Sequence, residues 1–211
     1  MRTPVPTLAR EAAAWADGCL LVGVDEVGRG PLAGPVVAAA VVFPAGCPRG
    51  TLRGLRDSKL LPPERRARLA EKIRARAVAI GIGAASVAEI DRLNIRRATA
   101  LAMRRALARV LGRVGRARVL VDGLPLPEIE VEHDALVDGD AYCASVAAAG
   151  IVAKLVRDDL MHRLARRHPG YGWDTNVGYG TEAHHDGLLR LGVTRHHRQS
   201  FGPVAQIPLP F

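Results

Sequence analysis

Two adjacent carboxylates stand out near the start of the sequence. Residues 24–34 read V-D-E-V-G-R-G-P-L-A-G, so Asp25 and Glu26 follow a short apolar run. Charged side chains rarely end a core strand unless a metal ion, a phosphate or another side chain compensates them. Neighbouring side chains of a regular strand point to opposite faces, so both can hold one ion only where the strand ends or is distorted. Gly28 and Gly30 permit such a break, because glycine adopts backbone angles that other residues avoid.

Further aspartates lie at the ends of predicted elements. Asp122 ends the apolar run in V-L-V-D-G, Asp140 begins a predicted helix in V-D-G-D-A, and Asp158 lies farther along that helix. Three or four carboxylates from separate elements suit Mg²⁺ or Mn²⁺, which prefer oxygen ligands. Asp140 and Asp158 cannot both contribute if the helix is continuous, because it would separate them by roughly 27 Å. The residues alone leave an N-cap open for Asp140 and a salt bridge to Arg157 or Arg163 for Asp158.

The glycines after the acidic pair also match a nucleotide-binding pattern. Gly28-x-Gly30-x-x-Ala33 has the spacing of the dinucleotide fingerprint, which predicts a following helix and an acidic residue about 20 positions on. Two prolines and a valine-rich strand follow instead, and residues 36–56 contain no acid. The fingerprint therefore fails. The glycines can instead expose bare N–H groups to a sugar or phosphate, with Arg29 between them, although a salt-bridged loop remains an alternative.

The hydrophobic pattern predicts the elements that position these residues. Strands are expected at 20–24, 36–43, 77–85, 119–121 and 129–131, the last with an extension towards 137 left open. Helices are expected at 64–76, 94–111, 141–168 and 182–191, with a glycine-rich loop at 170–180. Residues 1–18 are expected to form a loose or weakly helical lead-in. Strands followed by helix–strand–helix units predict an α/β fold with a mixed sheet.

The composition bounds the class of protein. The chain has 211 residues, 48% of them hydrophobic, which suits one domain with a real core. A net charge of +9 favours a polyanionic partner, nucleic acid above all. Lysine occurs only at Lys59, Lys72 and Lys154, so coding bias towards arginine explains the excess almost as well.

Cysteine usage and hydropathy indicate the compartment. Cys19, Cys47 and Cys143 are odd in number and form no C-x-x-C pair, so neither disulfides nor structural zinc are expected. No signal peptide is evident, and the longest apolar stretch, 36–43, is too short to span a bilayer. A cytoplasmic protein without membrane attachment is expected.

Taken in order, the motifs resemble those of the bacterial ribonuclease HII family over about residues 21–204. The matching stretches are G-V-D-E-V-G-R-G-P-L-A-G (23–34), D-S-K (57–59), L-N-I-R-R-A-T-A-L-A-M-R-R-A (93–106), L-V-D-G (120–123), G-D (139–140), A-K-L-V-R-D (153–158), Y-G-W (171–173), G-Y-G-T (178–181) and H-R-Q-S-F-G-P-V (197–204). The resemblance implies a ribonuclease H-like fold, with a mixed central sheet flanked by helices and a C-terminal helical extension. The catalytic domain would span 19–204, between the lead-in 1–18 and a flexible tail 205–211.

The resemblance implies an activity and a catalytic site. It implies a metal-dependent endonuclease that hydrolyses the RNA strand of RNA–DNA hybrids, cleaves at ribonucleotides embedded in duplex DNA for their excision repair, and leaves 5′-phosphates. The implied catalytic residues and metal ligands are Asp25, Glu26, Asp122 and Asp140, with two Mg²⁺ or Mn²⁺ ions during catalysis. This choice leaves Asp158 outside the set.

The resemblance also implies substrate contacts. Gly28, Arg29 and Gly30 resemble the family's reader of the ribose 2′-hydroxyl, and Tyr179 resembles the residue that stacks beside the scissile junction. Candidate phosphate contacts are Ser58, Lys59 and Arg198, with a solvated surface role as the alternative for each. The histidine pairs 184–185 and 196–197 lack the spacing of a zinc site, so phosphate-side or surface roles are expected.

Three positions depart from the family's pattern: Val177 where lysine is frequent, Gly150 where serine is usual, and Leu124 where asparagine is common. A competing hypothesis is a basic hybrid- or RNA-binding module that has lost catalysis. The four carboxylates argue against it, because a pure binder gains nothing by aiming them at phosphates.

The end of the chain predicts a protein partner. Gln206, Leu209 and Phe211 form Q-x-x-L-x-F, which resembles the short peptide by which bacterial replication and repair proteins dock on the sliding clamp. Intervening prolines would hold the segment extended and lower the entropy lost on docking. A chance match, or Phe211 folded back onto the domain, is the alternative. The enzyme itself is expected to be a monomer.

Overall fold

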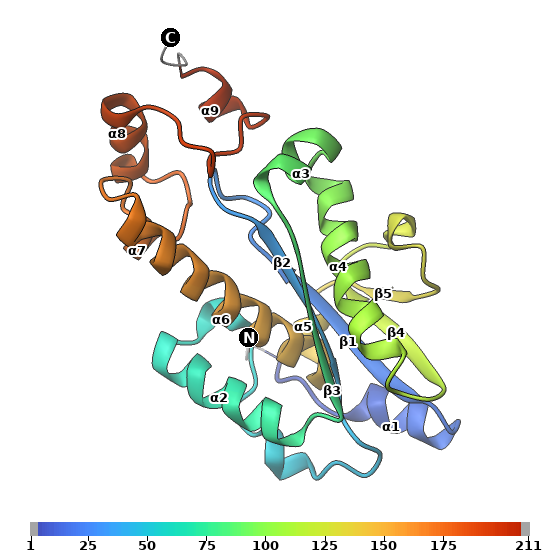
Figure 1. The fold of residues 1–211 in the computed structure, drawn as a ribbon. Helices are drawn as coiled ribbons and strands as arrows, with labels where there is room; N and C mark the ends of the chain where they lie inside the picture. The colour runs from blue at the N-terminus through green and yellow to red at the C-terminus, as the bar shows by residue number, and fades with distance from the viewer. Residues whose placement is uncertain (1–3, 208–211) are drawn as a thin grey trace.

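A mixed five-stranded sheet forms the centre of the protein, in a computed structural model that describes residues 4–207 (Figure 1). The strands are β1 (Leu20–Val27), β2 (Val36–Val42), β3 (Ala79–Ala85), β4 (Ala117–Asp122) and β5 (Asp134–Leu136). Their order is β3-β2-β1-β4-β5. The pairs β1–β2 and β2–β3 are antiparallel, whereas β1–β4 and β4–β5 are parallel. The predicted α/β fold with a mixed sheet is confirmed.

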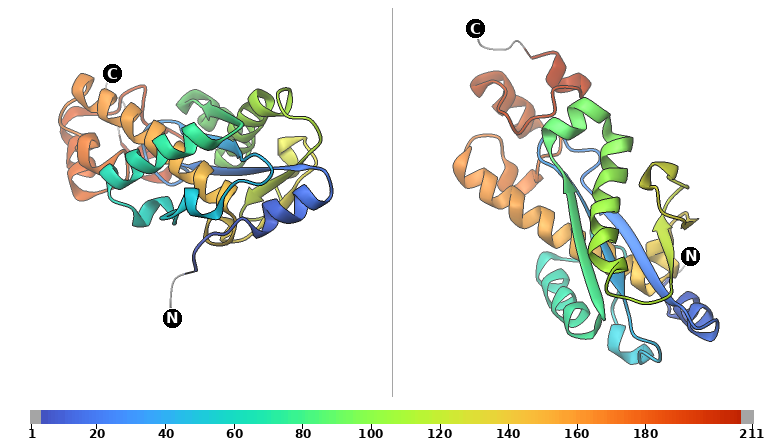
Figure 2. Two further views of the ribbon diagram at one scale, coloured as in Figure 1. Left: turned by 90° about the horizontal axis from the view of Figure 1, so that it is seen from below. Right: turned by 45° about the vertical axis from the view of Figure 1, so that its right-hand side comes forward.

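Helices cover both faces of this sheet (Figures 1 and 2). They are α1 (Ala9–Ala16), α2 (Pro63–Arg76), α3 (Val87–Leu93), α4 (Ile95–Leu111), α5 (Gly139–Tyr142), α6 (Ala144–Arg167), α7 (Trp173–Asn176), α8 (Glu182–Leu191) and α9 (Gly202–Ala205), with short 3₁₀ turns at Arg49–Leu52, Ser58–Leu60 and Pro127–Ile129. One buried cluster joins α2 and α6 to β2, and a second joins α4 to the opposite face. A third gathers α7, α8 and α9 around the end of α6, which is the predicted C-terminal helical region.

The start of α6 lies unusually close to β1. A Cβ atom at Gly23 would lie 2.3 Å from the carbonyl carbon of Ser145, so only glycine allows this approach. The result is that α6 crosses β1 directly beside the acidic pair that follows Gly23.

Two predicted elements differ from the observed ones. The predicted strand at 129–131 is wrong: a 3₁₀ turn begins at Pro127, buries Ile129 and ends at Glu130, which has a φ of 59°. Strand β5 comes later, at the end of the extension left open in the sequence. The predicted helix 141–168 is divided at Cys143, whose φ of −119° and ψ of 125° are extended, so α5 and α6 are separate.

The N-terminal lead-in is more ordered than expected. Helix α1 packs against the sheet through Ala14. Its Glu11 is fully buried and accepts hydrogen bonds from the Ser145 N–H at 2.7 Å and the Ser145 hydroxyl at 2.6 Å. Thr7 accepts a bond from the Ala144 N–H at 3.0 Å. This segment therefore caps the start of α6.

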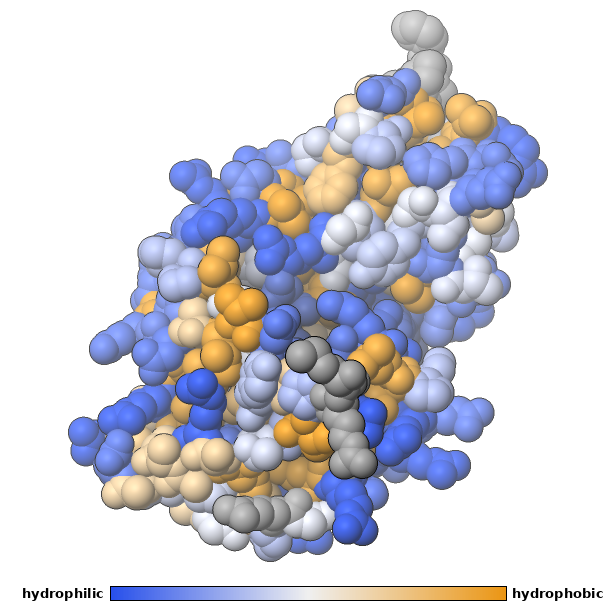
Figure 3. Space-filling view, turned by 180° about the vertical axis from the view of Figure 1, so that it is seen from behind, coloured by the Kyte–Doolittle hydropathy of each residue, from blue (hydrophilic) through white to orange (hydrophobic). Residues whose placement is uncertain are grey.

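The surface and the cysteines fit the expectations from composition. Cys19, Cys47 and Cys143 are all free and buried. Figure 3 shows polar residues spread over one face of the molecule, with apolar residues in small patches between them. Within residues 4–207, no helix combines the length and apolarity needed to cross a bilayer.

Candidate active site

Asp25 and Glu26 lie inside β1 rather than at its end. They pair with Ala39 and Ala38 of β2, and the strand continues past them. The break predicted at the acidic pair is therefore wrong, and the two carboxylates belong to opposite faces of the sheet. The physical reason is that the β2 ladder extends beyond the pair, so the chain turns only at Gly28, where φ is +90°.

Asp25 and Asp122 lie side by side on the face covered by α6. The parallel register pairs Val24 with Val121, so the next residue of each strand points to the same side. Asp140 joins them from α5, and the negative charges of Asp122 and Asp140 both act on Asp25. Three of the four predicted carboxylates thus lie in one neighbourhood, near the carboxyl ends of β1 and β4.

Crowding and burial change the acidity of these carboxylates. Burial raises the pKa of Asp25 well above its ordinary value, and the charges of Glu26, Asp122 and Asp140 raise it further. Burial also raises the pKa of Asp122. Burial, followed by the charge of Asp122, raises the pKa of Asp140 to about 6. A bound cation relieves this kind of mutual repulsion.

Backbone groups hold two of the carboxylates in place. An Asp25 oxygen accepts the Glu26 N–H at 2.7 Å, and an Asp122 oxygen accepts the Gly139 N–H at 2.6 Å. The other Asp25 oxygen rests against Gly150, where an added Cβ would lie 2.3 Å from it. The glycine at position 150 therefore has a physical role, because any side chain there would displace the Asp25 carboxylate.

Glu26 faces a separate cavity of ≈ 280 Å³ on the α4 side of the sheet. Asp122 and Arg29 also line this cavity, and Leu124 forms part of its apolar wall. The Arg29 guanidinium donates to Glu26 at 3.2 Å. Because Asp122 ends its strand, it lines the cavity and also neighbours Asp25. It therefore links the two sides of the group formed by Asp25, Glu26, Asp122 and Asp140, which we call the acidic centre.

The acidic centre has the donors of a divalent-cation site but not yet its geometry. Its donors are all carboxylate oxygens, the type that Mg²⁺ and Mn²⁺ prefer. Across residues 4–207, no three His, Cys, Asp or Glu side chains lie close enough together to hold one ion. Binding of one ion by three of these side chains would therefore require the carboxylates to move closer together.

The glycine–arginine–glycine turn and Tyr179 lie together. An added Cβ at Gly30 would meet nothing nearer than the Tyr179 ring carbon Cε1, at 3.7 Å. Tyr179 is 40% exposed, and Arg29 is exposed beside it. The structure thus brings these three predicted substrate contacts to one open surface.

The predicted phosphate contacts differ from one another. Lys59 is exposed, whereas Ser58 is buried and its carbonyl accepts a bond from Arg66 at 3.0 Å. The prediction for Arg198 as a phosphate or surface residue is wrong. Its guanidinium is fully buried, because main-chain carbonyl oxygens of residues 28, 29 and 34 accept its bonds.

Asp158 forms ion pairs away from the acidic centre, but not with the arginines that were predicted. Its partners are Arg66, at 3.3 Å, and Lys154, at 2.7 Å. Arg163 pairs instead with Asp159, and Arg157 contacts only main-chain carbonyls. Arg66 therefore joins Asp158 to the D-S-K turn.

Two of the four paired histidines are buried, which corrects their predicted surface role. The Trp173 indole donates to His184 Nε2 at 3.0 Å, and His197 Nε2 lies 3.1 Å from the same atom. His184 Nδ1 lies 2.9 Å from the Tyr179 carbonyl oxygen. Burial lowers the pKa of His184 and lowers that of His197 to about 3, so the His197 ring is neutral at pH 7. They support the backbone of the Tyr179 loop.

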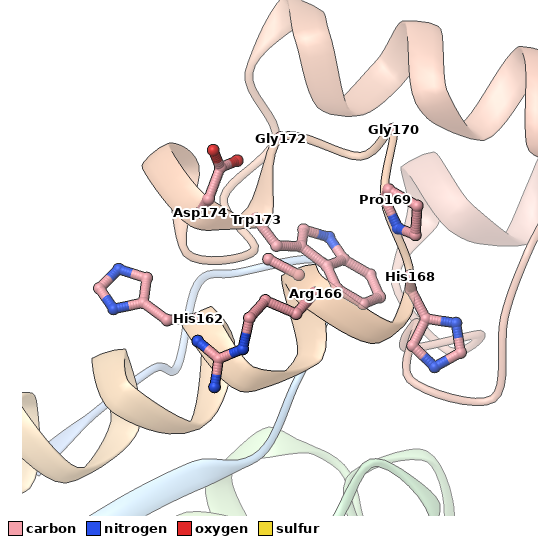
Figure 4. Close-up of a pocket in the computed structure, with 9 residues that line it drawn as sticks. His162, Arg166, His168, Pro169, Gly170, Gly172, Trp173 and Asp174 are labelled. Carbon is pink, nitrogen blue, oxygen red and sulfur yellow. The ribbon is translucent and has the colours of Figure 1, made fainter.

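A larger hollow of ≈ 600 Å³ lies beyond this histidine cluster, at the end of α6. Figure 4 shows Trp173 in its wall, close to Arg166 and His168. No member of the acidic centre lines it. Its size therefore does not make it the candidate active site.

Sequence reasoning missed several residues around the acidic centre. The charges of Asp57 and Asp138 both raise the pKa of Asp140, after burial and Asp122. Asp138 is adjacent to the G-D motif and Asp57 belongs to D-S-K, so both were visible in the sequence. Nothing in the local pattern indicated that Arg157 would be buried against the glycine-rich turn.

Comparison with known proteins gives one consistent result. A model of the family "Ribonuclease HII" matches residues 22–204. A ribonuclease HII of Synechococcus sp. (strain JA-3-3Ab) is 55% identical over 203 residues, covering 96% of this chain and 90% of that protein.

Solved structures agree with this result. Ribonuclease H2 from Pyrococcus horikoshii OT3 superposes with a TM-score of 0.75 at 25% identity, covering 89% of this chain and 96% of that one. A ribonuclease HII from Archaeoglobus fulgidus, solved in complex with PCNA, superposes with a TM-score of 0.69 at 25% identity, covering 85% and 93%. The chain belongs to the ribonuclease HII family, divalent-metal-dependent endonucleases that hydrolyse the RNA strand of RNA–DNA hybrids.

Proposed function

We propose that Asp25, Glu26, Asp122 and Asp140 are the catalytic residues, and that the enzyme also cuts at single ribonucleotides within duplex DNA. The observation that carries the catalytic assignment is the neighbourhood of Asp25, Asp122 and Asp140 near the ends of two parallel strands, where burial raises the pKa of each and nearby negative charges raise it further. Carboxylates held in that condition are poised to bind cations.

The same four residues would hold the metal ions. An all-oxygen donor set favours Mg²⁺ or Mn²⁺, and four carboxylates on both sides of β1 suit two ions better than one. When bound by these residues, such ions would supply a nucleophilic water and stabilise negative charge on the phosphate oxygens, and the hydrolysis would leave a 5′-phosphate. The Glu26 and Gly139 N–H groups fix one oxygen each of Asp25 and Asp122, which restricts their rotation before any ion binds.

Recognition of the ribonucleotide is proposed for the surface formed by Gly28, Arg29, Gly30 and Tyr179. The 2′-hydroxyl distinguishes RNA from DNA at one position, and an amide beside glycine can approach it closely. The Tyr179 ring lies next to Gly30 and is exposed enough to stack on the adjoining sugar or base. Because these residues form one compact surface, a single ribonucleotide would suffice for recognition.

Phosphate contacts are proposed for the D-S-K turn. Lys59 is exposed, and its positive charge is near enough to Asp140 to oppose, in part, the rise in the pKa of that carboxyl group. Ser58 lies below the surface, so its contribution would be to hold the turn rather than to reach the substrate by itself. Contacts of this kind position the duplex without reading its sequence.

A cleavage assay tests the proposal directly. Duplex DNA containing one ribonucleotide is incubated with the protein in Mg²⁺, in Mn²⁺ and in EDTA, beside an all-DNA duplex of the same sequence. We expect metal-dependent cleavage of the first duplex only, with a 5′-phosphate on the downstream product. An intact ribonucleotide duplex in both metals, under conditions that cleave a long RNA–DNA hybrid, would reject the single-ribonucleotide activity.

We also propose that the C-terminal segment docks on the sliding clamp of replication. Gln206 is exposed on the described part of the chain, whereas Leu209 and Phe211 lie outside the described residues. The structure of the Archaeoglobus fulgidus enzyme with PCNA supports clamp docking as a property available to such enzymes. Apolar side chains at 209 and 211 could fill a pocket while Gln206 bonds at its rim.

A peptide titration tests this docking. A fluorescent peptide of residues 201–211 is titrated with the cognate clamp, beside a peptide carrying Leu209→Ala and Phe211→Ala. We expect saturable binding of the first peptide only. Superimposable curves for the two peptides would exclude docking and leave the nuclease assignment unchanged.

Finally, we propose that the enzyme acts as a monomer in the cytoplasm. Both recognition and catalytic residues come from one chain, so no second copy is needed to complete the site. Light scattering on the purified protein tests the oligomeric state.

A further inference from the structure

Arg198 is a buried cation bonded to the turn that follows β1. It is fully buried, and its three donors reach the carbonyl oxygens of Gly34 at 2.9 Å, Arg29 at 2.8 Å and Gly28 at 2.5 Å. A buried guanidinium is costly unless its hydrogen bonds are satisfied. Here the backbone of the turn satisfies them. The carbonyl groups of the glycine–arginine–glycine turn are therefore held facing inward.

Arg157 is a second buried cation, and it joins the same turn to a different loop. Its donors reach the carbonyl oxygens of Pro35 at 3.0 Å, Ala33 at 3.1 Å and Val177 at 3.0 Å. Val177 stands two residues before Tyr179, so one guanidinium bridges the loop after β1 and the loop that carries the tyrosine. Within the described part of the chain, neither Arg157 nor Arg198 forms an ion pair.

Main-chain bonds complete the connection. The Leu32 N–H donates to the Gly178 carbonyl at 2.8 Å, and the Gly34 N–H donates to the His196 carbonyl at 2.8 Å. Ala33 also forms an isolated antiparallel bridge with His197. Three segments far apart in the sequence thus meet in one place, where the C-terminal segment approaches the loop after β1 (Figure 1).

The packing separates the roles of the two glycines in the turn. An added Cβ at Gly28 would lie 2.1 Å from Arg157 Nε, whereas one at Gly30 would meet only Tyr179, at 3.7 Å. Gly28 is therefore buried against Arg157. Gly30 is exposed and accessible to a ligand.

We propose that Arg157 and Arg198 are positioning residues for ribonucleotide recognition, because together they fasten the glycine–arginine–glycine turn and the Tyr179 loop into one rigid unit. This inference rests on the proposed reading of a ribonucleotide by that surface. Arginine is required because its planar fork supplies several donors in fixed directions, whereas a lysine ammonium cannot satisfy three carbonyls so placed. A rigid unit keeps the Gly30 amide and the Tyr179 ring at a constant separation.

The first measurement needs no activity. Hydrogen–deuterium exchange is compared for the metal-free wild-type protein, Arg157→Lys and Arg198→Lys, with Arg163→Lys as a matched control on the exposed side of α6. We expect each of the first two variants to speed exchange in both segments, 28–34 and 177–181, and the control to change neither. Faster exchange confined to segment 28–34 in Arg198→Lys, or confined to one of the two segments in Arg157→Lys, would overturn the coupling.

The second measurement concerns specificity. For Arg157→Lys and Arg198→Lys, we expect kcat/KM on a duplex with one ribonucleotide to fall at least tenfold more than kcat/KM on a long RNA–DNA hybrid. The long hybrid offers many alternative binding positions, so it depends less on exact placement of one ribonucleotide. Equal losses on both substrates would show a general structural role and overturn the inference. Failure of the proposed function is separate, because the wild-type protein itself would then leave the single-ribonucleotide duplex uncut.

A milder variant covers the case in which the lysine variants fold poorly. The Arg198 guanidinium lies over the Phe201 ring, 5.0 Å from its centre. Phe201→Leu removes this contact and keeps every carbonyl bond. We expect a smaller loss of the same selective kind, and an unselective loss would count against the proposal.

Discussion

Two groups of charges of opposite sign lie near the turn after β1, and they are compensated differently. Asp25 and its neighbouring aspartates repel one another, and the charge of Lys59 offsets this only in part, at Asp140. Arg157 and Arg198 are more deeply buried, but main-chain carbonyl groups accept their hydrogen bonds. The negative charge of the acidic centre is therefore left to be neutralised by ions from solution. The charges of Arg157 and Arg198, which we call the arginine cluster, are compensated within the fold. The comparison thus sets carboxylates that the fold leaves largely uncompensated beside arginines that it compensates in full.

The largest expected effect comes from removing a carboxylate of the acidic centre. We expect Asp25→Asn and Asp122→Asn each to lower kcat at least about 100-fold, since metal-held charge stabilisation contributes several kcal/mol. Binding of a hybrid should persist, because removing a carboxylate also removes repulsion from phosphate. Single-turnover cleavage and fluorescence anisotropy measure the two effects. More than about a tenth of the wild-type activity in either variant would remove that residue from the metal site.

The next effect distinguishes the two glycines beside the arginine cluster. Gly28→Ala should lower the free energy of unfolding by roughly 2–4 kcal/mol, because its φ of +90° disfavours a side chain and Arg157 occupies the space. Gly30→Ala should cost less than about 1 kcal/mol, since little surrounds it, yet it should reduce cleavage at a single ribonucleotide. Urea unfolding and cleavage assays on both variants compare them. Equal destabilisation would contradict the separate roles of the two glycines.

A pH experiment tests whether ionisation of Asp140 destabilises the acidic centre. The pKa of Asp140 in the folded protein, about 6, lies above its ordinary value of 3.8, so the ionised group destabilises the fold above pH 6. That destabilisation should fade as pH falls through 6 and be absent below 3.8. We expect Asp140→Asn to raise the Tm of metal-free protein at pH 8 and to have little effect near pH 4. A pH-independent difference in Tm would exclude ionisation as its cause.

The smallest expected effect concerns the histidines that support the Tyr179 loop. The pKa of His197 in the folded protein, about 3, lies below its ordinary value of 6.5, so this contribution to stability is complete above 6.5 and is lost as pH falls towards 3. Trp173 fluorescence reports unfolding of this region, because its indole bonds to His184. Urea unfolding followed by this signal in a Trp15→Phe background should give a free energy of unfolding for which the histidine contribution falls between pH 7 and pH 4. The same pH dependence in a His197→Gln variant would show that His197 does not contribute.

The sequence predicted the acidic residues better than their geometry. Carboxylates at the ends of apolar runs are visible as a pattern, and the strands that carry Asp25 and Asp122 were correctly predicted in type. Where β1 ends was not visible, because its length depends on pairing with β2, which is a contact between distant residues. The position of Glu26 on the other face follows from that pairing and could not be read locally.

The arginines illustrate the opposite limit. An arginine in a basic protein is expected at the surface, so Arg198 was assigned to phosphate. Its burial depends on carbonyls from residues 28, 29 and 34, which the fold brings within reach across more than 160 positions. Local patterns carry no record of such a partner. Local patterns also failed for the strand predicted at 129–131. There a 3₁₀ turn that begins at Pro127 buries Ile129, and β5 forms only at Asp134–Leu136.

The bridge between Ala33 and His197 has a consequence for the order in which the protein is made. A chain emerging from the ribosome exposes β1, β4 and α5 long before residues 196–198 exist, so the acidic centre can assemble early. The turn at 28–30 cannot be fastened until Arg198 has been synthesised, after every member of the acidic centre. A chain interrupted between α6 and Arg198 would therefore contain its carboxylates without the arginine that holds this turn.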